Sequence, residues 1–177
     1  MNREIKFRGK RVDNGEWVYG SLIGNDVIVG DIVEVNDEWF NTEWWYKVIP
    51  GTVGQYSGLK DRTGEEIYEG DIIEFYNLET YCINPDCDAH LHGHGSYLCK
   101  KEGVVKFDDG IFGVGDDSNH PLTPLSYCGI SKEMANDMKE DTYLATNGYG
   151  FYNPIVGVKV IGNIYDNPEL LKRCANE

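Results

Sequence analysis

Long hydrophobic runs are missing from this sequence of 177 residues. No uninterrupted apolar stretch approaches the roughly 18 residues that a membrane-spanning helix requires. The charged residues at 1–11 are not followed by the hydrophobic stretch of a secretion signal. We therefore expect a protein that stays in the compartment where it is made and has no membrane partner.

A regular cysteine pattern is also missing. The cysteines are odd in number and unevenly spaced, at Cys82, Cys87, Cys99, Cys128 and Cys174. Secreted domains held by disulfides carry an even number at regular spacing, because each bridge needs two thiols. The pattern therefore indicates a reducing environment, and we predict a cytoplasmic protein.

Familiar catalytic motifs are absent as well. The sequence contains no Gly-x4-Gly-Lys-Ser/Thr loop, dinucleotide fingerprint, Gly-x-Ser-x-Gly elbow or His-Glu-x2-His pair. Cys128, with His120 upstream, is a conceivable thiol nucleophile, but an inert buried cysteine is the favoured interpretation. The sequence thus favours a non-enzymatic protein and leaves open whether any catalytic activity exists.

Basic residues are few, since 16 of them stand against 30 acidic ones and the formal net charge is −14. Such a surface repels nucleic acid and anionic lipid, so direct nucleic-acid binding is disfavoured. The start of the chain is different, because Lys6, Arg8 and Lys10 alternate along an expected strand while Ile5 and Phe7 face inward. A solvated strand face is the simpler interpretation of these cations, and phosphate contact is the alternative.

What is present favours β-structure. The chain has 12% aromatic residues and contains 12 tyrosines and 21 glycines. Asn14-Gly15 and Asp109-Gly110 are typical of tight hairpin turns, and short helices are expected at 131–140 and 167–173. These signals predict a mainly β fold of small antiparallel sheets or SH3-like barrels, in a single domain over residues 1–177.

One short pattern occurs twice. Gly30–Val35 reads GDIVEV, and Gly70–Phe75 reads GDIIEF. Glycine supplies the unusual backbone angles of a turn and aspartate hydrogen-bonds backbone amides, so both segments predict a turn that enters a strand. The echo is consistent with an internal duplication, although six residues are too few to establish one.

Aromatic residues are concentrated in one region, as Trp39-Phe40 and Trp44-Trp45-Tyr46. Aromatic rings bury large areas and commonly anchor small cores. Core packing is therefore the favoured interpretation. A surface for a ligand or a protein partner is the alternative.

Residues 77–102 interrupt the β-pattern with cysteine, histidine and glycine, and we expect a variable insertion loop between two strands that pair with each other. The candidate zinc ligands in this segment are Cys82, Cys87, His90, His92, His94 and Cys99. Thiolate and imidazole are the usual donors for zinc, but the spacing lacks the Cys-x2-Cys pair of familiar zinc fingers. A loop without metal, bound zinc and redox chemistry all stay open.

The most distinctive segment is Val53–Ile72, VGQYSGLKDRTGEEIYEGDI, which resembles the signature segment of the YopX family of phage and prophage proteins. Residues 5–8 with 17–20, and residues 160–170, resemble the opening and closing blocks of that family. The resemblance therefore covers nearly the whole chain. It implies a small, mainly β protein encoded by a bacterial virus or an integrated element, and it implies no catalytic residue because none is defined for the family.

Turn-forming residues dominate this segment and predict a hairpin with Tyr56 and Tyr68 near its two bases. A structural turn that sets the strand register is the favoured interpretation. A protein-binding surface is the alternative, and it would be built from Gln55, Tyr56, Lys60 and Asp61.

Three functions are compatible with the sequence. The favoured one is a non-enzymatic module that binds a host or phage protein through an acidic, aromatic-bearing surface. The second is a zinc-binding or metal-dependent enzyme that uses the Cys/His insertion. The third is a structural protein that assembles into a homo-oligomer through its edge strands.

Overall fold

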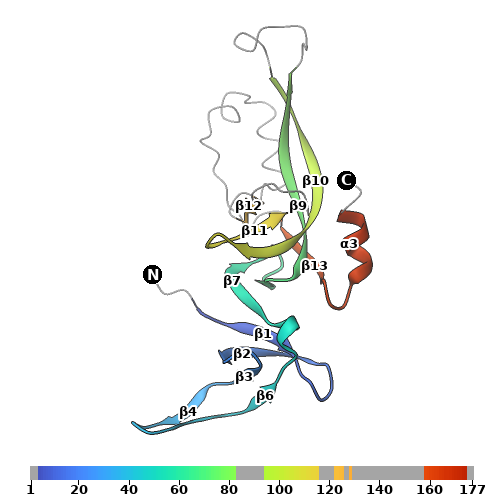
Figure 1. Ribbon diagram of the computed structural model, residues 1–177. Coiled ribbons are helices and arrows are strands. Elements are labelled where there is room, and N and C mark those ends of the chain that lie inside the picture. Colours follow the sequence, from blue (N-terminus) through green and yellow to red (C-terminus); the bar gives the residue numbers. More distant parts are fainter. Residues whose placement is uncertain (1–3, 83–93, 116–121, 126–127, 129–157, 175–177) are drawn as a thin grey trace. The chain divides into compact units, whose positions relative to one another are not determined.

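The computed structural model describes residues 4–82, 94–115, 122–125, 128 and 158–174. This part of the chain is mainly antiparallel β-structure, with one short α-helix, α3 (Pro168–Cys174), and one 3-10 turn (Pro50–Thr52) (Figure 1). The predicted mainly β fold is confirmed. The helix expected at 131–140 lies outside the described residues.

The chain divides into two compact units. The first comprises Met1–Leu59 and Glu66–Gly70, and the second comprises Lys60–Glu65 and Asp71–Glu177. The division falls within the distinctive segment Val53–Ile72, because the turn at 60–65 belongs to the second unit while its flanking residues belong to the first.

Six strands form the sheet of the first unit. They are β1 (Phe7–Lys10), β2 (Trp17–Ile23), β3 (Val27–Val29), β6 (Trp45–Lys47), β7 (Gly54–Lys60) and β8 (Glu66–Tyr68), in the order β6-β3-β2-β1-β7-β8. The predicted turn at Asn14-Gly15 joins β1 to β2, and Gly15 has the positive φ of 73° that such turns require.

This sheet curls back on itself. Arg11, just past β1, pairs with Val48, just past β6, and the amide of Ile49 donates to the carbonyl of Lys10. The two ends of the β6-β3-β2-β1 ladder therefore meet, as in a small barrel. Ile28 and Val48 are buried side by side against Gly9. The other buried apolar side chains of this unit are Val29, Tyr56, Ile67 and Tyr68.

Five strands form the sheet of the second unit. They are β9 (Asp71–Cys82), β10 (His94–Asp108), β11 (Ile111–Gly115), β12 (Thr123–Pro124) and β13 (Lys159–Asn163), in the order β12-β11-β10-β9-β13. Its buried side chains include Ile72, Ile73, Phe75, Val105, Val114, Leu125, Cys128 and Val158. The predicted turn at Asp109-Gly110 joins β10 to β11, and both of its residues have positive φ.

The strands on either side of the expected insertion pair with each other, as predicted. The β9–β10 ladder runs from Ile72 opposite Val104 to Cys82 opposite His94. Of the segment 77–102, residues 77–82 therefore continue β9 and residues 94–102 begin β10. Residues 83–93 lie outside the described part of the chain.

Candidate functional site

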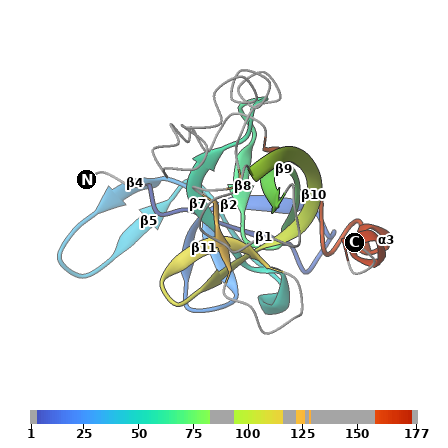
Figure 2. The same ribbon diagram turned by 90° about the horizontal axis from the view of Figure 1, so that it is seen from above.

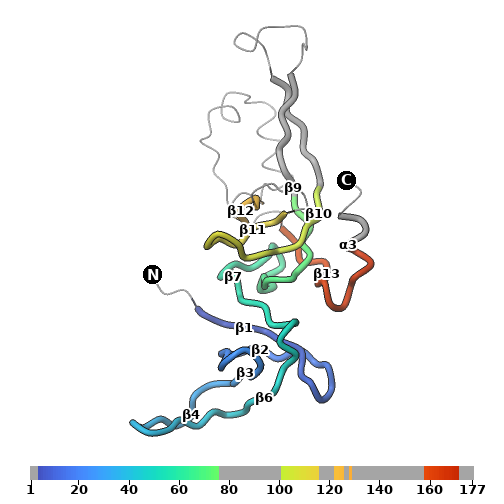
Figure 3. The backbone as a smooth tube through the Cα atoms, viewed as in Figure 1, coloured from blue at the N-terminus to red at the C-terminus, as the bar shows by residue number. Residues whose placement is uncertain are grey.

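A single long hairpin extends from the sheet of the first unit. Its base is β3 paired with β6, and its far part is β4 (Ile32–Val35) paired with β5 (Phe40–Thr42), so β4 and β5 run out beyond the sheet (Figures 1 and 2). The backbone passes without interruption from β3 to β4 (Figure 3). We name residues 30–44 the arm.

Backbone hydrogen bonds connect the two parts of this hairpin. The amide of Gly30 donates to the carbonyl of Trp44 at 3.0 Å, and the amide of Glu43 donates to the carbonyl of Asp31 at 2.9 Å. A bulge at Val33 shifts the register between Ile32 and Glu34. The arm is thus a continuation of the β3–β6 ladder with a bulge partway along it.

The tip of the arm is closed by Asn36. Its amide donates to the carbonyl of Trp39, and its side-chain oxygen accepts hydrogen bonds from the amides of Glu38 and Trp39, each at 2.9 Å. Asparagine forms local side-chain turns of this kind, which offer the backbone an alternative to further strand pairing. The tip is therefore a defined turn.

The base of the arm is held by a stack of rings. Trp44 lies against Gly30, its ring stacks on that of Tyr46 with centroids 5.5 Å apart, and the guanidinium of Arg11 lies 3.8 Å from the centroid of the Tyr46 ring. A cation on a ring face is attracted by the ring quadrupole. The stack therefore ties the arm to the β1–β2 turn.

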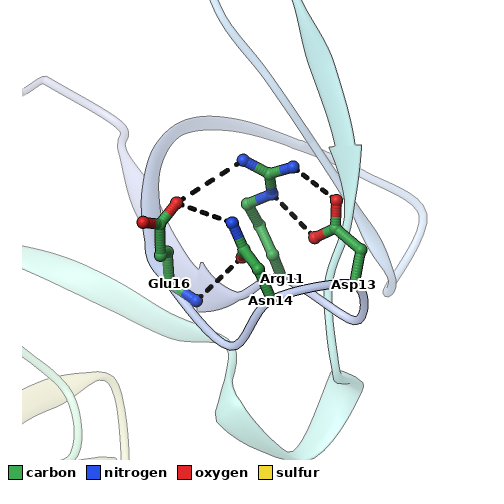
Figure 4. A network of polar contacts seen from close by, with 4 residues as sticks. All are labelled: Arg11, Asp13, Asn14 and Glu16. Carbon is green, nitrogen blue, oxygen red and sulfur yellow. Dashed lines mark hydrogen bonds and ion pairs between the residues drawn. The ribbon is translucent and has the colours of Figure 1, made fainter.

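Side chains of the β1–β2 turn hold the guanidinium of Arg11 in place (Figure 4). The carboxylate of Asp13 accepts two hydrogen bonds from the guanidinium of Arg11. A carboxylate oxygen of Glu16 lies 3.7 Å from the same guanidinium and accepts a hydrogen bond from the side-chain amide of Asn14 at 2.7 Å. The hydrogen bond from Arg11 lowers the pKa of the Asp13 carboxyl. The carboxylate form that orients Arg11 is therefore the form present at neutral pH.

The arm carries large apolar side chains in water. Ile32, Val33, Val35, Trp39 and Phe40 are between 47% and 69% exposed, and Trp45 next to its base is also exposed. The core interpretation of the aromatic cluster is wrong for Trp39, Phe40 and Trp45. The alternative, a surface for a partner, fits their exposure, because soluble proteins seldom leave large apolar side chains grouped on one exposed element.

The arm also differs sharply from the strand whose sequence it echoes. All four residues of β4 are exposed, whereas Ile72, Ile73 and Phe75 of β9 are buried. A run of β-branched residues without polar alternation is typical of a strand covered on both faces. Both faces of β9 are covered, since the consecutive residues Ile72 and Ile73 are buried, whereas neither face of β4 is covered within the described structure.

All charges on the arm are negative. It contains the acidic residues Asp31, Glu34, Asp37, Glu38 and Glu43 and no lysine or arginine. The arm thus joins apolar surface to carboxylates, which is the acidic, aromatic-bearing surface that the sequence predicted in kind but did not locate. The signal that could have located it is the unalternated run of β4 flanked by carboxylates.

The residues proposed from sequence as a protein-binding surface lie elsewhere. Gln55 is half-buried and Lys60 is exposed, while Tyr56 and Asp61 are buried. The predicted pairing of the two hairpin bases is confirmed, since the rings of Tyr56 and Tyr68 are 5.4 Å apart. A binding role for these residues stays a prediction.

Asp61 has a structural environment that explains its burial. Its carboxylate accepts hydrogen bonds from the hydroxyl and amide of Thr63 and from the amides of Glu65 and Val160. Burial by itself would raise the pKa of Asp61, but these hydrogen bonds outweigh it and lower that pKa. The residue joins the 60–65 turn to β13, which lies 99 positions away in sequence.

The candidate zinc ligands are only partly within the described residues. Cys82 and His94 are register partners at the end of the β9–β10 ladder, and Cys99 is opposite Asn77. Five residues of strand, or about 16 Å at the usual rise, separate His94 from Cys99. Cys87, His90 and His92 lie outside the described residues, so the zinc site stays a prediction.

Of the three cations expected on a solvated strand face, Lys6 and Lys10 are half-buried and Arg8 is not solvated. Arg8 is buried, with its guanidinium 4.7 Å from the ring of Trp17 and 5.0 Å from that of Tyr68. Lys6 pairs with Glu66 at 2.8 Å. The expectation of a solvated strand was therefore wrong for Arg8, because aromatic faces and the Glu69 carbonyl compensate its charge. Ile5, expected to face inward, is exposed.

Cys128 is a buried thiol. Its sulfur lies 3.5 Å from the carbonyl oxygen of Pro124, and burial raises its pKa to about 12. The reactive form of cysteine is the thiolate. At neutral pH this residue is therefore an inert thiol, and His120 lies outside the described residues.

Comparison with known proteins gives a family match and a similar solved structure. The family model described as YopX protein matches residues 6–172, and no curated protein matches the chain. The crystal structure of protein EF1440 from Enterococcus faecalis is similar at 21% identity, covers 96% of this chain and 99% of its own, and has a TM-score of 0.47. No helix in the described residues is long and apolar enough to cross a membrane.

Proposed function

This chain belongs to the YopX family, and we propose that it is a non-enzymatic module that binds another protein through the arm. In this proposal the protein is encoded by a phage or prophage and meets a host or phage protein in the bacterial cytoplasm. The observation that carries the proposal is the exposure of Ile32, Val33, Val35, Trp39 and Phe40 on one protruding hairpin.

The energetics of hydration support a binding role for these side chains. Removing one Val, Ile or Phe side chain fully from water contributes about 1.5–3 kcal/mol. The side chains of the arm are gathered on one element, so a single partner surface can cover several of them at once. A single exposed residue outside the arm, such as Val12, offers less area.

A photocrosslinking amino acid placed at Phe40 tests the proposal. The matched control is the same amino acid at Val12, which is exposed and apolar but lies in the β1–β2 turn. We expect position 40 to label one polypeptide in bacterial lysate and position 12 to label none. Excess wild-type chain should compete for the labelled polypeptide, whereas the Val35→Ser chain should not.

Three outcomes of this experiment are informative. Labelling from position 40 of a different protein, with the expected competition, supports the proposal. Equal labelling from both positions, or none from position 40, overturns it. A crosslink to a second copy of the chain replaces it with the alternative of a homo-oligomeric assembly protein.

The zinc-dependent alternative keeps one supporting observation, the register pairing of Cys82 with His94. Elemental analysis of the purified full-length chain tests it directly. Stoichiometric zinc that is lost in chelator together with stability would support a metal role for the insertion. Substoichiometric metal with unchanged stability would remove it.

A further inference from the structure

We propose that the occupant of the arm is an extended, cationic segment of another protein, which adds to the arm as a third β-strand. This inference rests on the proposed function and specifies the geometry and the charge of the partner. It follows from the free edges of the arm, from its uncompensated carboxylates and from the exclusion of a second copy.

The edges of the arm are open to strand addition. Within the described part of the chain β4 and β5 form a sheet of two strands, so each has a strand neighbour on one side only. The open side of such a strand presents backbone N–H and C=O groups that an extended peptide can pair with. The exposed side chains of Ile32, Val35 and Phe40 would pack against those of the added strand.

Within the described residues, no cation compensates the charges of the arm. Among the described residues no lysine, arginine or histidine forms an ion pair with Asp31, Glu34, Asp37, Glu38 or Glu43. Arg11, which lies against Tyr46 at the base of the arm, pairs with Asp13 and Glu16 instead. The carboxylates therefore attract a cationic partner.

The same charges argue against a second copy as the occupant. If two arms paired edge to edge, two segments that each carry five acidic residues and no lysine or arginine would lie side by side, and the repulsion of like charges is destabilising. Charged residues on edge strands commonly prevent self-association in this way. A strand that carries lysine or arginine meets the same carboxylates favourably.

The partner strand has a predictable pattern. Successive side chains of a strand point to opposite faces, and both faces of β4 are exposed. An added strand therefore needs β-branched or aromatic side chains to cover apolar neighbours and cations to meet the carboxylates. Alternating lysine and valine is the simplest peptide with these properties.

Three synthetic peptides of about ten residues, the length of a long strand, test the inference against the full-length chain. The first alternates lysine with valine, the second replaces each lysine by glutamate, and the third repeats the first with successive N-methylated amides that cannot donate. Fluorescence anisotropy of labelled peptide measures each affinity. We expect the first to bind about tenfold or more tightly than either of the others, and less tightly at high salt.

Charge variants separate binding at the arm from attraction to an acidic protein in general. In the variant Glu34→Lys with Glu38→Lys, which changes the formal charge of the arm from −5 to −1, the preference for the lysine peptide over the glutamate peptide should fall sharply. The control variant Glu4→Lys with Glu65→Lys makes the same total change of charge at two exposed residues outside the arm. Its preference for the lysine peptide over the glutamate peptide should equal that of the wild type. Equal effects of the two variants would overturn the inference.

The remaining outcomes separate the inference from the proposed function. If the N-methylated peptide binds as tightly as its parent, or the lysine peptide does not bind, the third-strand inference is wrong. The proposed function survives those results if position 40 still crosslinks specifically to another protein. If light scattering shows a dimer that Phe40→Ser abolishes, a second copy is the occupant and the inference is also wrong.

Discussion

The indole of Trp44 lies directly against Gly30, at the point where the arm leaves the sheet. A Cβ atom on residue 30 would lie 2.6 Å from Cε2 of that ring, closer than real Cβ atoms approach other atoms. The backbone hydrogen bond from Gly30 to Trp44 holds the two residues together. The absence of a side chain at position 30 is therefore a requirement of the ring stack at the base of the arm.

The variant Gly30→Ala tests this requirement. The added methyl group must displace Trp44 or the backbone, and overpacking of this kind costs about 1–3 kcal/mol in free energy of unfolding. Urea unfolding measures the change. The control Gly51→Ala, where a Cβ would meet no atom within 4 Å, should stay within about 0.5 kcal/mol of the wild type. Equal stability of the two variants would contradict the packing account.

Truncation of the two matching isoleucines in the repeated pattern should change the free energy of unfolding by very different amounts. Ile72→Ala removes a fully buried side chain from β9 and should lower the free energy of unfolding by about 2–5 kcal/mol. Ile32→Ala changes an exposed side chain of the arm and should leave stability within about 0.5 kcal/mol while weakening partner crosslinking. A large loss of stability in Ile32→Ala would show that β4 is covered in the free protein.

Removal of the Asp61 charge should destabilise the second unit. Asp61→Asn weakens several hydrogen bonds to a buried carboxylate, and hydrogen bonds to charged groups contribute about 1.5–3 kcal/mol each in favourable cases. Urea unfolding at neutral pH measures the loss. The control Glu65→Gln alters an exposed side chain in the same turn and should have little effect.

The pH dependence of this difference has a definite sign. The folded-state pKa of Asp61 is lowered, so its stabilisation is complete above the ordinary aspartate value and disappears as the pH falls through the folded value. The stability gap between wild type and Asp61→Asn should therefore narrow in that acidic range. A gap that stays constant as the pH is lowered would exclude the ionised carboxylate as its cause.

Hydrogen exchange should distinguish the arm from the sheet to which it is attached. A two-stranded hairpin is marginally stable in water by itself, so amides of β4 and β5 should exchange faster than those of β3 and β6. Tyr46→Ala removes the ring that links Trp44 to Arg11 and should accelerate exchange in the arm further. Uniform protection along the whole hairpin would contradict this expectation.

Local signals in the sequence predicted several features correctly. Asn14-Gly15 and Asp109-Gly110 form hairpin turns, in which Gly15, Asp109 and Gly110 adopt the positive φ that such turns require. The approach of Tyr56 to Tyr68 also follows from a local feature, the turn at 60–65 between the paired strands β7 and β8. In each case the residues that determine the feature are close together in the chain.

Features that depend on distant residues were not predictable in the same way. The burial of Arg8 depends on Trp17, Tyr68 and the carbonyl of Glu69, which is 61 positions away. The burial of Asp61 depends on Val160, which is 99 positions away. Alternation along a strand indicates only that its faces differ, and the residues that cover each face come from elsewhere in the fold.

The sequence by itself determined the β-rich composition, the positions of the tight turns and the excess of acidic residues, because these depend on residue type and nearest neighbours. Tertiary structure decided that GDIIEF at Gly70–Phe75 enters a core while GDIVEV at Gly30–Val35 extends into water. The physical reason is cover of the two faces: consecutive side chains of a strand point to opposite faces, and Ile72 and Ile73 of β9 are both buried, whereas all four residues of β4 are exposed in the described structure.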